Sequence, residues 1–165
     1  MTGAERTAVA SLGALYAVRM LGLFMVLPVI AIYLSAYQGY SPAMLGFALG
    51  AYGLTQALFQ IPFGLWSDRW GRKPVITVGL LIFLIGSVIA ATADTAFGVV
   101  IGRAIQGAGA VASTVLALVA DLTRDEQRSK AMAAIGMSIG LTFALSLILG
   151  PLVSSSYGLA GVFWF

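Results

Sequence analysis

The side chains best placed to do chemistry lie in one short charged segment between two long apolar runs. Its spacing is G-x-x-x-D-R-x-G-R-K, with one carboxylate, two glycines and three cations. The acid stands at the end of an apolar helix, where the partial negative charge of the helix terminus disfavours it and calls for a cationic partner. The segment therefore predicts ion pairing at a helix end, by Gly64, Asp68, Arg69, Gly71, Arg72 and Lys73.

A second acid, Asp121, stands in the same position at the end of a later apolar run. Arg72 and Lys73 are close enough in sequence to pair with Asp68, and Arg72 reaches Asp121 if the two helix ends pack together. Glycine allows a tight turn at Gly71 and close helix approach at Gly64. These side chains do not form a catalytic carboxylate pair, a serine triad or a phosphate loop.

The composition predicts a membrane protein. Hydrophobic residues make up 60% of the chain and charged residues 9%, whereas soluble domains are about 25% charged. Residues 20–67 and 131–165 carry no formal charge. The net charge of +3 is spread among loops and two helix interiors, which argues against nucleic-acid binding. The absence of Cys and His excludes disulfides, Cys/His metal sites and His-based catalysis. We therefore expect that the protein is not an enzyme and that it binds neither a cofactor nor a metal ion.

Helix punctuation divides the chain into five apolar spans and the start of a sixth. Ser41 and Thr95 are expected N-caps, and Pro42 and Pro74 suit the first turns of helices. We expect the first helix to be a retained span and not a cleaved signal peptide. The predicted fold is an all-α membrane protein, with polar turns between the spans, including one at 154–159. The expected spans are 8–34, 42–66, 74–93, 95–122 and 129–153, with a sixth beginning at 160–165.

The distribution of Lys and Arg predicts the topology. Cations precede the first span and follow the second and fourth, whereas the alternate loops at 35–41, 93–95 and 154–159 have none. Cytoplasmic loops carry an excess of Lys and Arg. The N-terminus and both charged loops are therefore expected in the cytoplasm, in a multi-pass protein of the cell inner membrane surrounded by lipid.

Two arginines are expected deep in the membrane. Arg19 lies about 16 Å into the first span and Arg103 about two turns into the fourth, where a lipid-facing Arg costs at least about 2.5–3.5 kcal/mol. Both should face the bundle interior, where Gln56, Gln60 and Gln106 could complete a polar transport path. The alternative is a structural tie from each arginine to helix carbonyls. No Asp or Glu lies deep in the five spans.

Four motifs carry a resemblance to one family. The G-x-x-x-D-R-x-G-R-K segment resembles the loop between helices 2 and 3 of major facilitator superfamily transporters. Residues 19–29 and 102–109 resemble the first- and fourth-helix motifs of its drug–proton antiporters. Gly150-Pro151 resembles part of the fifth-helix motif, with Ser154 and Ser155 in place of the usual paired glycines. Residues 59–64 and 121–124 resemble the YajR-type group of bacterial efflux transporters, which have an additional soluble C-terminal domain.

This resemblance implies the major facilitator fold, in which two six-helix halves enclose the transport path. Residues 1–165 would form a truncated N-terminal half, whose partners are a small-molecule substrate and the absent helices 6–12. In the family the loop acts as a latch, in which Asp68 meets a helix N-terminus of the other half and Arg72 pairs with Asp121. The implied function is proton-coupled efflux of small amphipathic compounds by alternating access. Kinks at Pro28, Gly150 and Pro151 would help to gate the outer side.

Several alternatives remain open. An importer of sugars or other polar solutes would share the loop motif, and a non-transporting membrane scaffold is a further alternative. Gly107–Ala112 fits a dinucleotide-binding fingerprint, but it lies in a helical run and lacks the required preceding strand. The G-x-x-x-G pairs at 46–50 and 136–140 suit either packing of helices within the chain or a homodimer.

Overall fold

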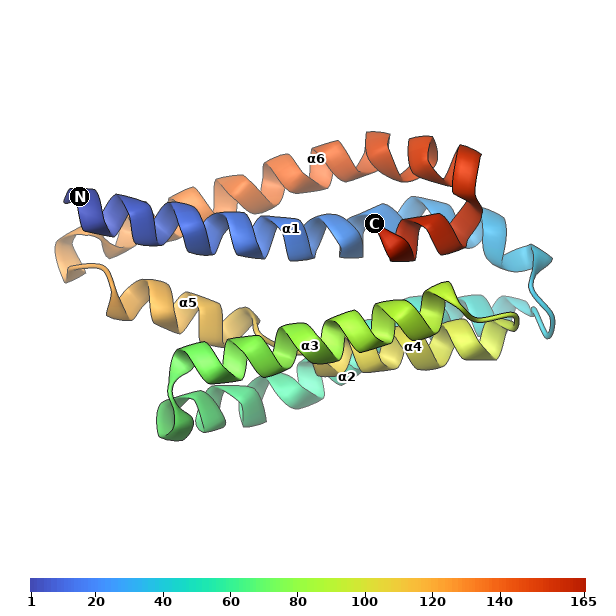
Figure 1. The fold of residues 1–165 in the computed structure, drawn as a ribbon, viewed down its shortest axis with the longest axis horizontal. Coiled ribbons are helices and arrows are strands. Elements are labelled where there is room, and N and C mark those ends of the chain that lie inside the picture. The colour runs from blue at the N-terminus through green and yellow to red at the C-terminus, as the bar shows by residue number, and fades with distance from the viewer.

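The computed structural model describes residues 1–165, which are helical almost throughout and contain no strand. Figure 1 shows long helices that run back and forth along one axis. Two of the helices are capped by side-chain hydroxyls, as predicted. The Ser41 hydroxyl accepts from the Met44 amide at 3.2 Å, and the Thr95 hydroxyl accepts from the Gly98 amide at 3.1 Å. The elements are α1 (Gly3–Tyr33), η1 (Leu34–Ala36), α2 (Pro42–Trp70), α3 (Arg72–Ala91), α4 (Ala96–Ala108), α5 (Ala112–Asp121) and α6 (Asp125–Trp164).

Five segments are long and apolar enough to cross a membrane, as the sequence predicts. They are α1 with η1, α2, α3, the α4–α5 pair and α6. Each contains at least 20 residues, which matches the length required to span the hydrocarbon core. Because every backbone polar group must be satisfied inside lipid, helices of this length are the structure expected of a multi-pass protein.

The helices form two packed groups. In Figure 1, α1 lies along α6, while α3 and α4 lie together with α2 behind them. Helices α3 and α4 approach each other closely, since a Cβ on Gly102 would lie 2.6 Å from the Ala90 amide nitrogen. Two apolar cores join the groups. One contains Tyr16, Phe63 and Ile135, and the other contains Met25, Val99 and Leu159.

The predicted charged loop at 67–73 is much shorter in the structure. Helix α2 continues to Trp70, α3 begins at Arg72, and Gly71 alone separates them. Gly71 has φ 91° and ψ 152°, a backbone conformation that residues with a Cβ rarely adopt. The predicted end of the second span at residue 66 was wrong because the helix does not stop where the apolar run stops. The charged residues of its last turn are compatible with a helix that extends beyond the membrane surface.

One predicted span has correct ends but contains a break that the sequence analysis did not predict, and one predicted turn was wrong. The predicted span 95–122 is interrupted between Ala108 and Ala112, which leaves α4 and α5 as separate helices. The predicted turn at 154–159 contracts to Gly158, whose φ of 63° interrupts the helical path. Ser154 and Ser155 lie in the continued helix, and their hydroxyls donate to the carbonyls of Pro151 and Leu152 in the preceding turn.

Candidate functional site: an ionic cluster and buried arginines

Arg72 joins two helix ends through a compact ionic cluster. Its Nε donates to Asp121 Oδ2 at 3.0 Å, and its Nη1 donates to Asp68 Oδ1 at 2.5 Å. The same Nη1 donates to the Ser67 hydroxyl at 2.6 Å, and Ser67 donates to the Gly64 carbonyl at 2.7 Å. The first turn of α3 therefore connects the end of α2 with the end of α5.

The cluster is half open to its surroundings. The Arg72 side chain is 22% exposed, whereas Asp68 and Asp121 are 58% and 54% exposed. Asp68 therefore keeps an accessible carboxylate while it is paired with Arg72. Arg69 and Lys73 are exposed and form no ion pair, so Lys73 does not serve Asp68. Ser67 is only 2% exposed and was missed, because a lone serine in a helix gives no signal of its contact with Arg72.

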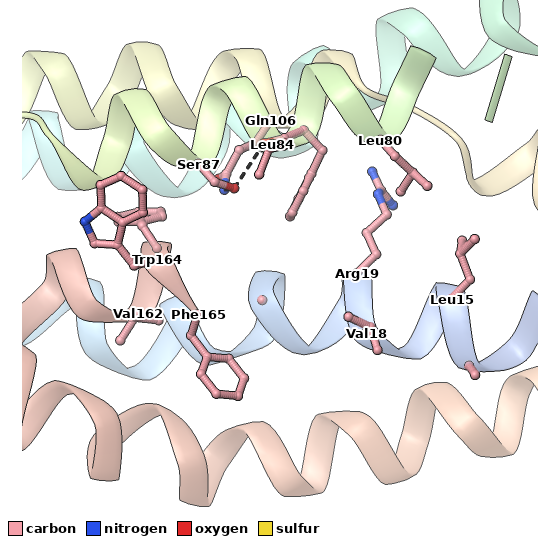
Figure 2. Close-up of a pocket in the computed structure, with 14 residues that line it drawn as sticks. Leu15, Val18, Arg19, Leu80, Leu84, Ser87, Gln106, Val162, Trp164 and Phe165 are labelled. Atoms are coloured by element: carbon pink, nitrogen blue, oxygen red, sulfur yellow. Dashed lines mark hydrogen bonds between the residues drawn. The ribbon is translucent and has the colours of Figure 1, made fainter. Parts of the chain in front are cut away.

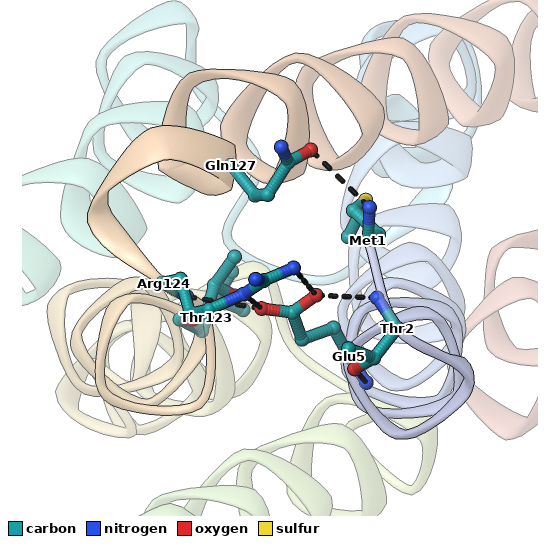
Figure 3. A network of polar contacts seen from close by, with 7 residues as sticks. Met1, Thr2, Glu5, Thr123, Arg124 and Gln127 are labelled. Atoms are coloured by element: carbon teal, nitrogen blue, oxygen red, sulfur yellow. Dashed lines mark hydrogen bonds and ion pairs between the residues drawn. The ribbon is translucent and has the colours of Figure 1, made fainter.

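A second polar network ties the start of α1 to the turn before α6 (Figure 3). Glu5 Oε1 accepts from Arg124 Nε at 2.9 Å and from the Arg124 amide at 3.2 Å. The amide of Thr2 donates to Glu5 Oε2 at 2.5 Å, which closes a capping box. The terminal amine of Met1 donates to Gln127 at 3.4 Å. The T-x-x-E spacing of Thr2 and Glu5 is a sequence signal for this cap, and the sequence analysis overlooked it.

Glu5 precedes the apolar part of the first span, and its titration reflects this network. The hydrogen bond from Arg124, together with the bond from the Thr2 amide, lowers the pKa of the Glu5 carboxyl from 4.5 to about 2. The same contact with Glu5 raises the pKa of Arg124. Both groups therefore remain charged across the physiological pH range, and the pair holds α1 to the α5–α6 turn.

Arg103 begins a buried chain of polar contacts inside the bundle. It is 1% exposed, lies 4.6 Å over the Tyr52 ring, and donates from Nε to the Ala48 carbonyl at 3.3 Å. Its Nη1 donates to Gln106 Oε1 at 2.9 Å, and Gln106 Nε2 donates to the Ser87 hydroxyl at 2.7 Å. The contact with Ala48 is the carbonyl tie considered as an alternative, and the structure adds a link through Gln106 to α3.

Arg19 occupies a different environment, although it is only 4% exposed. Its Nη2 donates to the Gly109 carbonyl at 2.9 Å, and its guanidinium lies 5.3 Å from the Phe83 ring centroid. Gly109 lies in the break between α4 and α5, where its carbonyl also accepts from the Val111 amide at 3.0 Å. Nε and Nη1 of Arg19 are buried and have no hydrogen-bond partner.

The other candidate path residues lie apart from these arginines. Gln56 and Gln60 are half-buried on α2, and neither side chain bonds to an arginine. Pro28 lies within continuous helix, and Pro151 does so next to Gly150. A Cβ on Gly150 would lie 2.7 Å from the Met25 carbonyl, so α6 contacts α1 closely here. Helix kinks at the two prolines stay a prediction.

Arg19 also lines a cavity of about 510 Å³ (Figure 2). Its walls come from α1, from α3, from one residue of α4 and from the last residues of α6, and ten of its fourteen lining residues are hydrophobic. Gln106 and Ser87 supply the remaining polar side chains. The bundle therefore holds both an ionic cluster at one end and a mostly apolar cavity with one incompletely paired arginine.

The family model of the Major Facilitator Superfamily matches residues 12–165. The chain belongs to this superfamily. Among its relatives, the inner membrane transport protein YajR of Escherichia coli (strain K12) is 56% identical over 99% of this chain and 36% of that protein. An uncharacterized transporter of Buchnera aphidicola subsp. Schizaphis graminum is 44% identical over 90% of this chain and 38% of its length. The superfamily and the YajR-type resemblance are thus confirmed.

The class E tetracycline resistance protein of Escherichia coli is a more distant relative. It is 30% identical over 86% of this chain and 35% of its own length. The chain spans little more than a third of these curated relatives. It therefore has the fold of the N-terminal part of a major facilitator transporter, a family of transporters and not generally of enzymes.

Proposed function

We propose that this chain is the N-terminal half of a proton-coupled exporter of small amphipathic compounds that works by alternating access. The observation that carries the proposal is the cluster around Arg72. It ties the ends of α2 and α5 together, yet leaves the carboxylate of Asp68 more than half exposed at the end of the bundle. An exposed acid fixed in this way suits a contact that forms in one conformation and breaks in the other.

The surfaces of the bundle support a second half that packs against α2 and α6. In their most apolar stretches, only 11% of the residues of α2 and 17% of those of α6 are buried, against 56% in the α4–α5 pair. The G-x-x-x-G pairs at 46–50 and 136–140 lie on these two helices, and a Cβ added at any of the four glycines would meet no other part of the chain within 4 Å. Small residues permit close helix approach in lipid, so these faces suit the absent helices. A homodimer through the same faces is the alternative.

Proton coupling requires a titratable group outside these spans. The six acids of the chain lie at the ends of helices or in turns, at Glu5, Asp68, Asp94, Asp121, Asp125 and Glu126. Arginine does not release its proton in proteins, so Arg103 would tune a carrier on another helix. Export, not import, is favoured by relatives that are named as resistance proteins, among them the class E tetracycline protein and the multidrug resistance protein MdtL of Klebsiella pneumoniae.

The proposal is tested by Asp68→Asn in the full-length transporter. Membrane insertion should remain normal, while cells should retain more of a fluorescent amphipathic dye because the conformational equilibrium loses its latch. Asp125→Asn is a matched control, because Asp125 is an exposed acid that pairs only with Arg128 in the next turn of its own helix. Equal dye export by Asp68→Asn and the unmodified protein would refute the latch. Dye accumulation driven by the unmodified protein would indicate an importer, and no flux of any cargo would favour the scaffold.

A further inference from the structure

The two ionic networks at one end of the bundle meet in a single turn. This turn, residues 121–124, connects the last residue of α5 with the start of α6. Asp121 accepts from Arg72 on α3, whereas Arg124, three residues later, donates to Glu5 on α1. In Figure 1 the starts of α1 and α3 and the end of α5 lie at the same end of the molecule. Charged contacts from two different helices therefore hold this turn.

Helix α5 relies on such contacts for its position. It has only ten residues, Ala112–Asp121, and the break after Ala108 separates it from α4. Because the residues between the two helices are not helical, α4 does not fix the direction of α5. The far end of α5 is therefore placed by its own packing and by the contacts of the turn that follows it.

The contact with Glu5 fixes the backbone of this turn. Glu5 Oε1 accepts from the Arg124 amide at 3.2 Å as well as from Arg124 Nε at 2.9 Å, and Oε2 accepts from Nη2 at 3.4 Å (Figure 3). Hydrogen bonds between ionised groups are stronger than neutral ones. The Glu5 side chain is only 8% exposed, so the loss of its partner would leave a poorly hydrated carboxylate. Glu5 thus holds the main chain three residues beyond Asp121.

We propose that Glu5 is a positioning residue for the Arg72 cluster. By holding the backbone of Arg124 it fixes the turn, and the turn keeps the Asp121 carboxylate where it meets Arg72 Nε. Without Glu5 the end of α5 would shift, and Arg72 would lose one of its two acidic partners. The inference deepens the proposed function and rests on it for its meaning in transport, because Asp68, the proposed latch, pairs with the same guanidinium.

A thiol placed beneath Arg72 reports on the cluster from another helix. Ser67 lies on α2, is 2% exposed and accepts from Arg72 Nη1 at 2.6 Å. In the variant Ser67→Cys, a water-soluble maleimide should therefore reach the thiol only when the cluster opens. The labelling rate is measured in detergent micelles on the full-length transporter, with no other cysteine present.

The change Glu5→Gln in this background should increase the labelling rate at least about threefold, because residues of one ionic network are energetically coupled. Glutamine keeps an acceptor for the Thr2 amide, so the cap of α1 remains. Asp121→Asn, which removes a direct partner of Arg72, is the positive control. Glu126→Gln is the matched negative control, because Glu126 is exposed, forms no ion pair and should leave the rate unchanged.

Two further measurements separate positioning from a general loss of packing. The first places the reporter at Ala91, which is 7% exposed at the opposite end of α3, and Glu5→Gln should not change the labelling of Ala91→Cys. The second combines Glu5→Gln with Arg124→Gln. Each should speed labelling at position 67, and the pair should do so no more than the larger single change, because both remove the same contact.

Equal labelling at position 67 in Glu5→Gln and Glu126→Gln would overturn the inference. An equal increase at positions 67 and 91 would also overturn it, because Glu5 would then stabilise the bundle as a whole. If Glu5→Gln does not insert, Arg124→Gln decides by the same criteria. None of these measurements involves transport, so normal dye export by Asp68→Asn would refute the latch and leave the positioning role of Glu5 in place.

Discussion

The coupling between Arg72 and Asp121 can be measured with a double-mutant cycle. The perturbations are Arg72→Gln, Asp121→Asn and the double variant, each compared in free energy of unfolding with the parent protein. The pair joins Nε to Oδ2 at 3.0 Å and connects residues on α3 and α5, 49 positions apart in the chain. The cycle therefore reports a tertiary contact between helix ends.

The expected magnitude follows from exposure. A fully exposed ion pair contributes about 0.2–1 kcal/mol, because solvent screens it. Asp121 is 54% exposed, but Arg72 is only 22% exposed and is also held by Asp68 and Ser67. Asp68 and Ser67 already restrict the Arg72 side chain, so its contact with Asp121 costs little additional conformational entropy. The coupling energy should therefore lie at the upper end of that range. We expect a coupling of about 1 kcal/mol that decreases as salt is raised.

Unfolding in mixed micelles, followed by circular dichroism, is a suitable assay. Arg128 and Asp125 provide a matched control pair, because they lie 2.7 Å apart one turn apart on α6 with side chains 48% and 87% exposed. Their coupling should be below about 0.5 kcal/mol. Zero coupling between Arg72 and Asp121, or a value no larger than that of the control pair, would refute the account of the cluster as a clamp between helices.

Three further predictions concern the rest of the bundle. The Gly102→Ala variant should be about 1–3 kcal/mol less stable to unfolding than the Gly46→Ala variant. The new Cβ at position 102 would meet the Ala90 backbone, whereas a Cβ at position 46 would point into open space. Equal stabilities of the two variants would contradict this packing. Arg103→Ala in the full-length transporter should abolish proton-driven flux in proteoliposomes, and normal flux would reduce Arg103 to a packing role. Glu5→Gln should lower the free energy of unfolding by a constant amount above about pH 4.5, and this loss should vanish as the pH falls through 2. The reason is that the lowered pKa of Glu5 stabilises the folded state only while the carboxyl is ionised. A difference in stability that persists below pH 2 would argue against the ion pair.

Much of the fold was predictable because lipid imposes a simple rule on sequence. Uncharged apolar runs must be helices, so the five spans and the caps at Ser41 and Thr95 followed from composition and punctuation. The break at Gly109 was not predictable in this way. Glycine is common inside membrane helices, and the Gly109 carbonyl at the break accepts from Arg19, a residue 90 positions away.

The sequence predicted which charged residues form the candidate site better than it predicted the hydrogen bonds between them. The charges of Asp68, Arg72 and Asp121 stand out in an apolar sequence, and their positions at helix ends suggested pairing. Ser67 and Ser87 did not stand out, because a helical serine usually bonds to its own preceding turn. Both do so here, and each also accepts from another side chain, Ser67 from Arg72 across the α2–α3 junction and Ser87 from Gln106 on α4.

The central claim is that the cluster at the α2–α3 junction lies on the cytoplasmic side of a membrane-embedded bundle. The 165 residues contain no cysteine, so Trp70→Cys and Asp94→Cys each introduce a single reporter, at opposite ends of α3. A membrane-impermeant maleimide should label the Asp94 variant in intact cells and the Trp70 variant only after permeabilisation. Labelling of the Trp70 variant in intact cells would contradict the account.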